Sequence, residues 1–408
     1  MNILIIHGNF PGQFLHLAPF LSRQGHKVVF LTESDNPQGL HLQDVVLCHF
    51  SKSFLNNLEK APTHQQKALL RAQHVSLAIH QLSAQGFDVD LVIAHGGKGY
   101  GLLPRSEIPN VKLLLYVEWF FTSDTSQYLF REYDSAAWSR CEVKNMPLLR
   151  EMSLADAIVC PSNWQKQQFP LEYRSKITVI FDGIDHHLFP EATPDSRVCS
   201  LVLKGTSGEE FMIRSDDLLL TYATRGMEPL RGFPEFMRAA AAAMQKFPHL
   251  KVVIAGKDRQ AYSYSPTDKI ISWKDFMLDE LKDQLDLSRL YFPGLLPYVQ
   301  LSRMLRRSNL HCYFTRPYVI SWSFYQAVAT KSALMINHFP GLEDVIEQPS
   351  SIDCVDIDDQ AMINSFVCRY LSSPDAAFTD LPLSLMPGLD LSNCLSQYAC
   401  LLDSLMNQ

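Results

Sequence analysis

Short apolar runs alternate with longer amphipathic stretches along most of the 408 residues, and this alternation restricts the fold more than any other feature. Strands are predicted in the first half over residues 3–6, 27–31, 91–94, 111–117, 157–160 and 177–181. Helices are predicted over residues 13–24 and 65–85. Because helical crossovers join parallel strands, the pattern predicts an α/β protein built on doubly wound parallel sheets.

Residues 186–215 interrupt the alternation with a more polar stretch that contains the turn signals Pro194-Asp195-Ser196 and Gly205-Thr206-Ser207-Gly208. Such a stretch is typical of a linker followed by a small hairpin. The alternation then resumes, with strands predicted over residues 218–222, 252–255, 290–292, 310–314, 334–336 and 352–355. Helices are predicted over residues 234–247, 297–307, 321–331, 359–371 and 391–405.

The interruption divides the chain into two Rossmann-like domains, residues 1–185 and 186–385. Residues 386–408 are expected to form a C-terminal helix that packs back toward the first domain. Ligands of open parallel sheets bind outside the carboxyl ends of the strands. Two facing sheets of this kind are therefore expected to enclose an interdomain cleft.

Charge and cysteine content exclude several classes of protein. The formal net charge of -7 disfavours a nucleic-acid partner, which requires bulk positive charge. The nine cysteines are odd in number and show no Cys-x-x-Cys spacing, which indicates reduced thiols in a cytoplasmic protein. The apolar run at the N-terminus is too short for a signal peptide or a membrane span. Any membrane contact, such as one at the inner membrane face, is expected to be peripheral.

Sequence motifs of hydrolases, zinc peptidases, P-loops and EF-hands are missing from the chain. The adjacent pair His186 and His187 points in two directions in any regular element and is not predicted to bind metal. The glycine-rich residues 96–101 are interpreted as a turn rather than a phosphate loop. The first loop, residues 7–13, has glycines at a strand-to-helix turn, which suit either close approach to an anion or sugar or a structural turn.

Two arginines, Arg225 and Arg231, flank a predicted turn between a strand and a long helix. Converging guanidinium groups neutralise a diphosphate, including the charge that develops on it as a leaving group. A pair of solvated surface arginines is the alternative interpretation. Further along, Ser321 or Ser323 begins another helix, either as a cap or as part of an anion site.

Taken in order, these features resemble a large family of retaining glycosyltransferases of GT-B fold, which includes sucrose synthase and many bacterial lipopolysaccharide and capsule enzymes. The resemblance spans nearly the whole chain. It rests on the loop at Gly12, Pro161-Ser162-Asn163-Trp164, Phe181-Asp182-Gly183-Ile184-Asp185, Arg225 with Arg231, Phe292-Pro293-Gly294-Leu295-Leu296-Pro297-Tyr298, the block from Pro317 to Ser332, and Phe339-Pro340-Gly341-Leu342-Glu343-Asp344-Val345-Ile346.

This resemblance implies transfer of a sugar from a nucleotide diphosphate sugar, UDP being a common carrier, with retention at the anomeric carbon and without a metal or other cofactor. Arg225 and Arg231 are implied to hold the diphosphate, and Glu118 to stand where many relatives have a catalytic histidine. Further donor contacts are implied for Gly12, Gly294, Leu296, Tyr298, Ser321, Trp322, Ser323 and Gln326. The acceptor, a glycan, a lipid-linked molecule or a protein, is implied to lie near Asn9, His95 and Trp119.

Three residues depart from the family pattern. Tyr318 and Gln326 stand where many relatives have glutamates, and Lys331 stands where glycine is usual. An amide offers a ribose diol one acceptor oxygen instead of two, which weakens donor binding. These departures leave open a catalytically silent nucleotide-sugar or glycan-binding protein, and also a nucleotide-sugar epimerase or glycoside phosphorylase on the same fold. A monomer and a homodimer are both compatible with the sequence.

Overall fold

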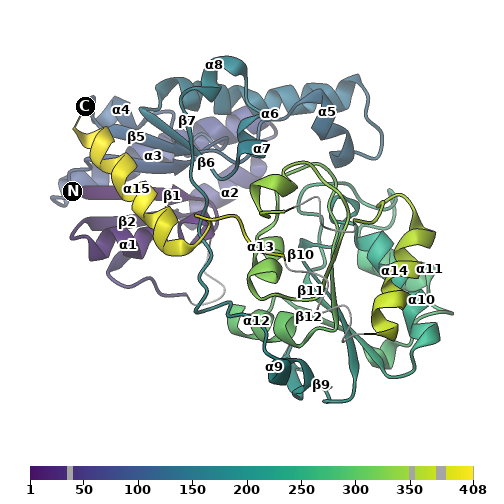
Figure 1. Cartoon of the computed structure of the whole chain (residues 1–408). Coiled ribbons are helices and arrows are strands. Elements are labelled where there is room, and N and C mark those ends of the chain that lie inside the picture. Colours follow the sequence, from purple (N-terminus) through teal and green to yellow (C-terminus); the bar gives the residue numbers. More distant parts are fainter. Residues whose placement is uncertain (35–39, 349–353, 374–382, 408) are drawn as a thin grey trace. The chain divides into compact units, whose positions relative to one another are not determined.

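The structure is a computed structural model that describes residues 1–34, 40–348, 354–373 and 383–407. It contains two compact units (Figure 1). Unit 1 comprises Met1–Asp124, Tyr133–Gly183 and Gly388–Gln408, and unit 2 comprises Thr125–Glu132 and Ile184–Pro387. The chain thus changes unit next to the predicted boundary at residue 185.

One short segment differs from the predicted division. The structure places Thr125–Glu132 with unit 2, although the sequence prediction assigned it to the first domain. Its side chains explain the assignment, because Arg131 forms an ion pair of 3.0 Å with Asp268 and the ring of Tyr128 lies 6.0 Å from the guanidinium carbon of Arg316. Such long-range pairs leave no local pattern in a sequence.

Unit 1 is built on a seven-stranded sheet in which every pair of neighbours is parallel. Its order is β3-β2-β1-β4-β5-β6-β7. The strands are β1 (Asn2–His7), β2 (Lys27–Thr32), β3 (Val45–His49), β4 (Leu91–His95), β5 (Lys112–Tyr116), β6 (Ala157–Cys160) and β7 (Ile177–Val179). The chain winds outward from β1 to β3 and then restarts at β4, so the topological switch point lies between β1 and β4.

The helices of unit 1 bury the apolar faces of this sheet. They are η1 (Gly12–Phe14), α1 (Leu17–Arg23), α2 (Lys52–Lys60), α3 (His64–Ala84), α4 (Pro104–Glu107), α6 (Ser135–Leu154), α7 (Asn163–Lys166), α8 (Leu171–Arg174) and α15 (Leu391–Met406); α5 (Ser123–Ser126) and η2 (Gln127–Leu129) follow β5. Helix α3 begins with a capping box formed by Thr63 and Gln66. The predicted return of the last helix is visible in Figure 1, where α15 lies beside this sheet, and a Cβ on Gly183 would stand only 2.8 Å from the Cα of Leu391.

Unit 2 is built on a five-stranded parallel sheet with the order β12-β11-β10-β13-β14. The strands are β10 (Leu218–Gly226), β11 (Leu250–Lys257), β12 (Leu290–Gly294), β13 (Leu310–Tyr313) and β14 (Leu334–Ile336). The predicted hairpin is present as β8 (Leu201–Lys204) and β9 (Glu210–Ile213), which pair antiparallel. The switch point of the larger sheet lies between β10 and β13.

The helices of unit 2 are α9 (Pro194–Val198), η3 (Pro229–Arg231), α10 (Phe233–Lys246), α11 (Trp273–Glu280), η4 (Leu287–Arg289), α12 (Tyr298–Arg307), α13 (Trp322–Ala329), η5 (Leu342–Asp344) and α14 (Gln360–Ser372). Helix α10 contains a run of five alanines that favours helix and permits close packing on the sheet. The predicted strand over residues 352–355 lies partly outside the described residues, and Val355 forms only an isolated bridge with Asn337.

Candidate functional site

A cluster of polar side chains lies at the switch point of unit 1, where β1 and β4 end. His7 ends β1, His95 ends β4, and Glu118 follows β5. The His95 Nε2 atom lies 3.1 Å from Glu118 Oε2, and the Gln13 amide donates a short hydrogen bond to Glu118 Oε1. The rings of His7 and His95 contact edge to face, with centroids 4.6 Å apart. The fold therefore brings a carboxylate, two imidazoles and an amide to one point.

The imidazole of His7 is neutral at physiological pH, because burial lowers its pKa to about 3 and the nearby His95 adds to the shift. Its Nδ1 lies 2.6 Å from the backbone oxygen of Asn9 and 2.8 Å from the backbone nitrogen of Asn9. Gly12 has φ +55°, and a Cβ there would stand 2.6 Å from the His7 ring. Gly12 therefore permits the first loop to close over this imidazole.

The predicted acceptor residues take different places around this cluster. His95 and Glu118 are in direct contact, while Asn9 reaches His7 through its backbone and its side chain is exposed. Trp119 is buried, with its ring centroid 6.1 Å from that of Trp164. Gln13 belongs to the first loop that the sequence marked as a candidate, but it was not singled out there; it lies in η1, directly after Gly12.

Two buried polar atoms of this cluster lack a hydrogen-bond partner in the described structure. Within the described parts of the chain, the buried atoms without a hydrogen-bond partner include His7 Nε2 and Gln13 Oε1. Buried polar atoms usually have partners. The cluster is consequently suited to a molecule rich in hydroxyl groups.

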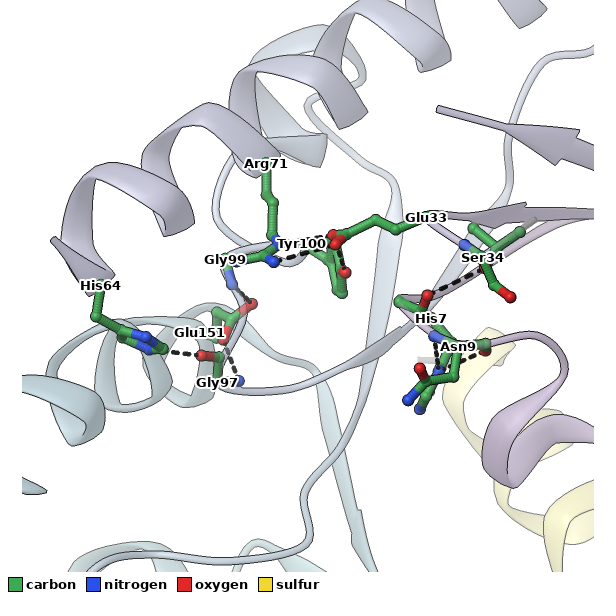
Figure 2. A network of polar contacts seen from close by, with 12 residues as sticks. His7, Asn9, Glu33, Ser34, His64, Arg71, Gly97, Gly99, Tyr100 and Glu151 are labelled. Atoms are coloured by element: carbon green, nitrogen blue, oxygen red, sulfur yellow. Dashed lines mark hydrogen bonds and ion pairs between the residues drawn. The ribbon is translucent and has the colours of Figure 1, made fainter. Parts of the chain in front are cut away.

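The glycine-rich residues 96–101 form a turn around a carboxylate of the chain itself. The backbone nitrogens of Gly99 and Gly101 donate to Glu151 Oε1 at 3.0 and 2.9 Å, and that of Gly97 donates to Oε2 at 2.6 Å. Figure 2 shows Glu151 of α6 between Gly97 and Gly99. These amides are already engaged, in agreement with the interpretation of this segment as a turn.

Burial raises the pKa of Glu151 from 4.5 to about 7, against the opposing effect of the three amides. In the unfolded chain this carboxyl group loses its proton near 4.5, so between pH 4.5 and 7 the folded state binds more protons. We expect the stability of the wild type relative to a Glu151→Gln variant to fall across this window and then to level off. Urea unfolding at a series of pH values measures this, and a constant or rising difference contradicts it.

A second, partly buried contact fixes the neighbouring strand ends of unit 1. Glu33, just after β2, accepts hydrogen bonds from Arg71 Nε at 2.6 Å and Nη2 at 3.1 Å, and also from the Tyr100 hydroxyl (Figure 2). The bidentate geometry is the stronger form of such a pair. Arg71 thus ties α3 to the residue that follows β2.

In unit 2, two predicted arginines converge on one aromatic ring. Arg225 Nη1 donates to the Tyr262 hydroxyl at 3.1 Å, and the guanidinium carbon of Arg231 lies 5.8 Å from the centroids of both the Tyr262 and Tyr318 rings. Arg231 is only 7 % exposed and its Nη1 donates to Thr315 Oγ1 at 2.9 Å. We call these five residues the arginine site; it lies at the switch point between β10 and β13.

Glu228 positions Tyr262 within the arginine site. This carboxylate is fully buried, and its Oε2 accepts hydrogen bonds of 2.9 to 3.0 Å from the backbone nitrogens of Ala261, Tyr262 and Ser263. Sequence reasoning missed both Tyr262 and Thr315. Tyr262 lies in an irregular loop, so its proximity to the arginines depends on this long-range capture of amides by Glu228.

Ser321 caps the start of α13, which is one of the two roles that the sequence left open. Ser321 Oγ accepts a hydrogen bond of 3.3 Å from the Ser323 backbone nitrogen, and the backbone nitrogen of Ser321 donates to the Tyr313 hydroxyl at 3.2 Å. Trp322 is the first residue of this helix, and Gln326 lies buried within it. Tyr318, where relatives have a glutamate, instead packs its ring 5.0 Å from that of Tyr262.

Lys331 stands where the C-terminal cap of α13 requires a left-handed backbone, since its φ is +53°. The backbone nitrogen of Lys331 donates to the Val328 oxygen, and that of Ser332 to the Ala327 oxygen. This pair of bonds is a Schellman motif, in which glycine is the usual residue. The departure from the family pattern at Lys331 therefore concerns backbone strain.

Replacing Lys331 by glycine is expected to raise the free energy of unfolding by about 0.5 to 1 kcal/mol, because relief of strain outweighs the added freedom of the unfolded chain. Lys331→Ala is the matched control, since it also removes the contact of 3.9 Å with Glu191 but keeps the strained backbone. Denaturant unfolding compares the two. Equal stability of both variants contradicts the strain.

The remaining predicted donor residues lie at the end of β12, the edge strand of the unit 2 sheet. Gly294 has φ +74°, and a Cβ there would stand 2.6 Å from Thr206 Oγ1, so glycine permits the hairpin loop to approach. Leu296 is buried, and the ring of Tyr298 contacts that of Phe189 edge to face at 6.0 Å. These residues shape a separate loop, two strands away from Arg225.

Among the residues described here, no group of three or more His, Cys, Asp or Glu side chains is arranged to hold a metal ion. None of the described helices combines the length and the apolar character needed to cross a bilayer.

Comparisons with known proteins agree with this architecture. Residues 24–189 match a family model described as the Glycosyl transferase family 4 group. The search of curated proteins found no match.

Solved structures resemble the chain over nearly its whole length. Sucrose-phosphate synthase from Thermosynechococcus elongatus has a TM-score of 0.69 and 14% identity, and the similarity covers 99% of each chain. HepE from Anabaena, solved with UDP and glucose, has a TM-score of 0.62 and 14% identity, covering 99% of this chain and 100% of that one. Starch synthase IV from Arabidopsis thaliana, solved with ADP and acarbose, has a TM-score of 0.64 and 12% identity, covering 100% and 99%. The protein therefore has the GT-B fold, with two α/β units that are each built on a parallel sheet, as the sequence predicted.

Proposed function

We propose that this protein is a glycosyltransferase that transfers a sugar from a nucleotide diphosphate sugar to an acceptor, with retention at the anomeric carbon and without a metal. The observation that carries the proposal is the arginine site, where two guanidinium groups converge at the switch point of unit 2. Ligands of open α/β sheets bind at such points. A diphosphate is the anion that two arginines in this geometry suit best.

The arginine site is proposed to promote departure of the nucleoside diphosphate. Negative charge grows on the diphosphate as its bond to the sugar breaks, and fixed guanidinium groups stabilise that charge without rearrangement. The buried Arg231 is held in place by Thr315, while the exposed Arg225 is held by Tyr262. Ser321, Trp322 and Ser323 at the start of α13 are proposed to lie beside the same anion, where the helix dipole favours negative charge.

Glu118 is proposed to act on the sugar or the acceptor in unit 1. Its carboxylate is oriented by His95 and Gln13, so that it either accepts hydrogen bonds from sugar hydroxyls or stabilises positive charge at the anomeric carbon. The relatives support a UDP or ADP carrier, because HepE was solved with UDP and starch synthase IV with ADP. A cytoplasmic enzyme that makes a surface glycan, with peripheral membrane contact at most, fits this proposal.

A thermal-shift screen tests donor binding, because a ligand of the native state raises the melting temperature. UDP, ADP and their glucose esters are the first probes, with uridine and adenosine as controls. We expect one diphosphate and its sugar ester to stabilise the protein. The anomeric configuration of the product, read by NMR after transfer to a panel of acceptors, then tests retention.

The alternatives give different results in this experiment. Binding of a nucleotide sugar without transfer or hydrolysis would favour a silent binding protein, the alternative raised by Tyr318, Gln326 and Lys331. A product of unchanged mass would favour an epimerase. A Glu118→Gln variant that keeps donor binding but transfers at the rate of the wild type would contradict the role of Glu118.

A further inference from the structure

The loop after β11 brings a third arginine, Arg259, to the arginine site. β11 ends at Lys257, and the backbone nitrogen of Arg259 donates to the Lys257 oxygen at 2.9 Å. A Cβ on Gly226 would stand 2.7 Å from the backbone oxygen of Arg259, so the loop passes directly against the last residue of β10. Arg225 and Arg259 are consequently neighbours on two strand ends in backbone contact.

This neighbourhood is fixed by contacts that leave the Arg259 side chain uncommitted. Glu228 Oε2 binds the amides of the next residues of the loop, from Ala261 to Ser263. The Arg259 guanidinium is exposed. The position of the loop is therefore set by the backbone and by Glu228, while the guanidinium remains available to solvent and ligand.

The arginines here also lack the ion pairs that arginines form elsewhere in the molecule. In the described parts of the chain, the arginines with a carboxylate within ion-pair distance include Arg71, Arg105, Arg131, Arg238, Arg289 and Arg316. Arg225, Arg231 and Arg259 are not among them. Desolvation and the charge of Arg225 lower the pKa of Arg259. The charge of Glu228 acts on Arg259, but three guanidinium groups gathered here still make this part of the chain more positive than the whole chain of net charge -7.

We propose that Arg259 binds the diphosphate of the donor together with Arg225 and Arg231. The excess charge selects a ligand with two or more negative charges on adjacent phosphates over a nucleoside monophosphate. Binding of that anion also offsets the repulsion between the charges of Arg225 and Arg259. This inference rests on the proposed function, and it adds a residue that the sequence motifs do not mark.

Isothermal titration calorimetry of the full chain tests the proposal, with UDP, ADP and the corresponding monophosphates titrated separately. The variants are Arg259→Gln and Arg259→Lys, and Arg214→Gln is the matched control because Arg214 is exposed in the same unit. We expect Arg259→Gln to weaken diphosphate binding about tenfold, the effect of one charge-assisted hydrogen bond, and monophosphate binding much less. The diphosphate affinity of Arg259→Lys is expected to lie between those of the wild type and Arg259→Gln. Arg214→Gln is expected to bind the diphosphate as the wild type does.

The salt dependence of binding separates a direct contact from a structural role. Loss of one phosphate contact makes the affinity for the diphosphate fall less steeply with sodium chloride, whereas a merely loosened loop leaves the slope unchanged. Diphosphate affinity within twofold of the wild type in Arg259→Gln would overturn the role of Arg259 alone. A wild-type protein that binds neither UDP nor ADP would overturn the proposed function as well.

Discussion

Replacing Arg231 by alanine is expected to lower donor turnover by about two to three orders of magnitude, the usual effect of removing one fixed donor from a site of developing negative charge. Arg231 is buried, faces the rings of Tyr262 and Tyr318, and is held by Thr315. Loss of its side chain removes one buried hydrogen bond, at a cost of about 1 to 3 kcal/mol in stability. A domain of ordinary stability remains folded after such a loss.

Apart from the hydrogen bond to Thr315, Arg231 supports the fold through its backbone. The Tyr222 hydroxyl donates to the Arg231 backbone oxygen at 2.6 Å, and this bond survives truncation of the side chain. Steady-state turnover of the nucleotide sugar, beside the melting temperature of the same preparation, measures both effects. Arg231→Lys is the matched control and is expected to keep partial activity, since it retains the charge without the planar fork. Unchanged turnover in folded Arg231→Ala protein would contradict the role of Arg231 in stabilising the departing diphosphate.

The sequence predicted the two sheets well because their strands are buried on both faces and read as continuous apolar runs. It missed β3, an edge strand whose residues are all half-buried or exposed. It also missed α6, because Asn145, Pro147 and Glu151 break the apolar pattern although all three are buried. Asn145 binds the backbone of Phe121, and Glu151 binds the glycine-rich turn. Buried polar residues with backbone partners cannot be told from solvated ones by periodicity.

The candidate site was predictable where its residues belong to motifs at strand ends. Arg225 and Arg231 lie in one short segment, so a turn between strand and helix already brings them near each other. Arg259 and Tyr262 lie 28 and 31 residues beyond Arg231, in a loop with no regular structure. Their approach depends on three amides bound by Glu228 and on the missing side chain of Gly226. Neither contact produces a residue spacing that could be recognised in the sequence.

The second large effect is expected on stability, from Arg307 of α12. This side chain is 1 % exposed, and its guanidinium donates to the backbone oxygens of Cys199, Arg214 and Asp217 at 2.8 to 2.9 Å. These carbonyls flank the β8–β9 hairpin and precede β10, so Arg307 joins the hairpin to the sheet. Burial lowers the pKa of the guanidinium. Burying this charge costs free energy, and the cost is offset only when all of the hydrogen bonds of the guanidinium are made.

Replacing Arg307 by methionine, which keeps much of the volume, leaves those carbonyls without their donor. At about 1 kcal/mol or more for each unsatisfied group, we expect a loss of about 3 to 5 kcal/mol and a melting temperature lower by roughly 10 °C. Arg303→Met, one turn earlier on the same helix and exposed, is the matched control and is expected to change stability by less than about 0.5 kcal/mol. Differential scanning calorimetry of the three proteins measures the effect. An Arg307→Met variant as stable as Arg303→Met would contradict this prediction and would show that water replaces the guanidinium at little cost. Nucleotide binding should weaken as well, because the hairpin loop packs through Thr206 on Gly294.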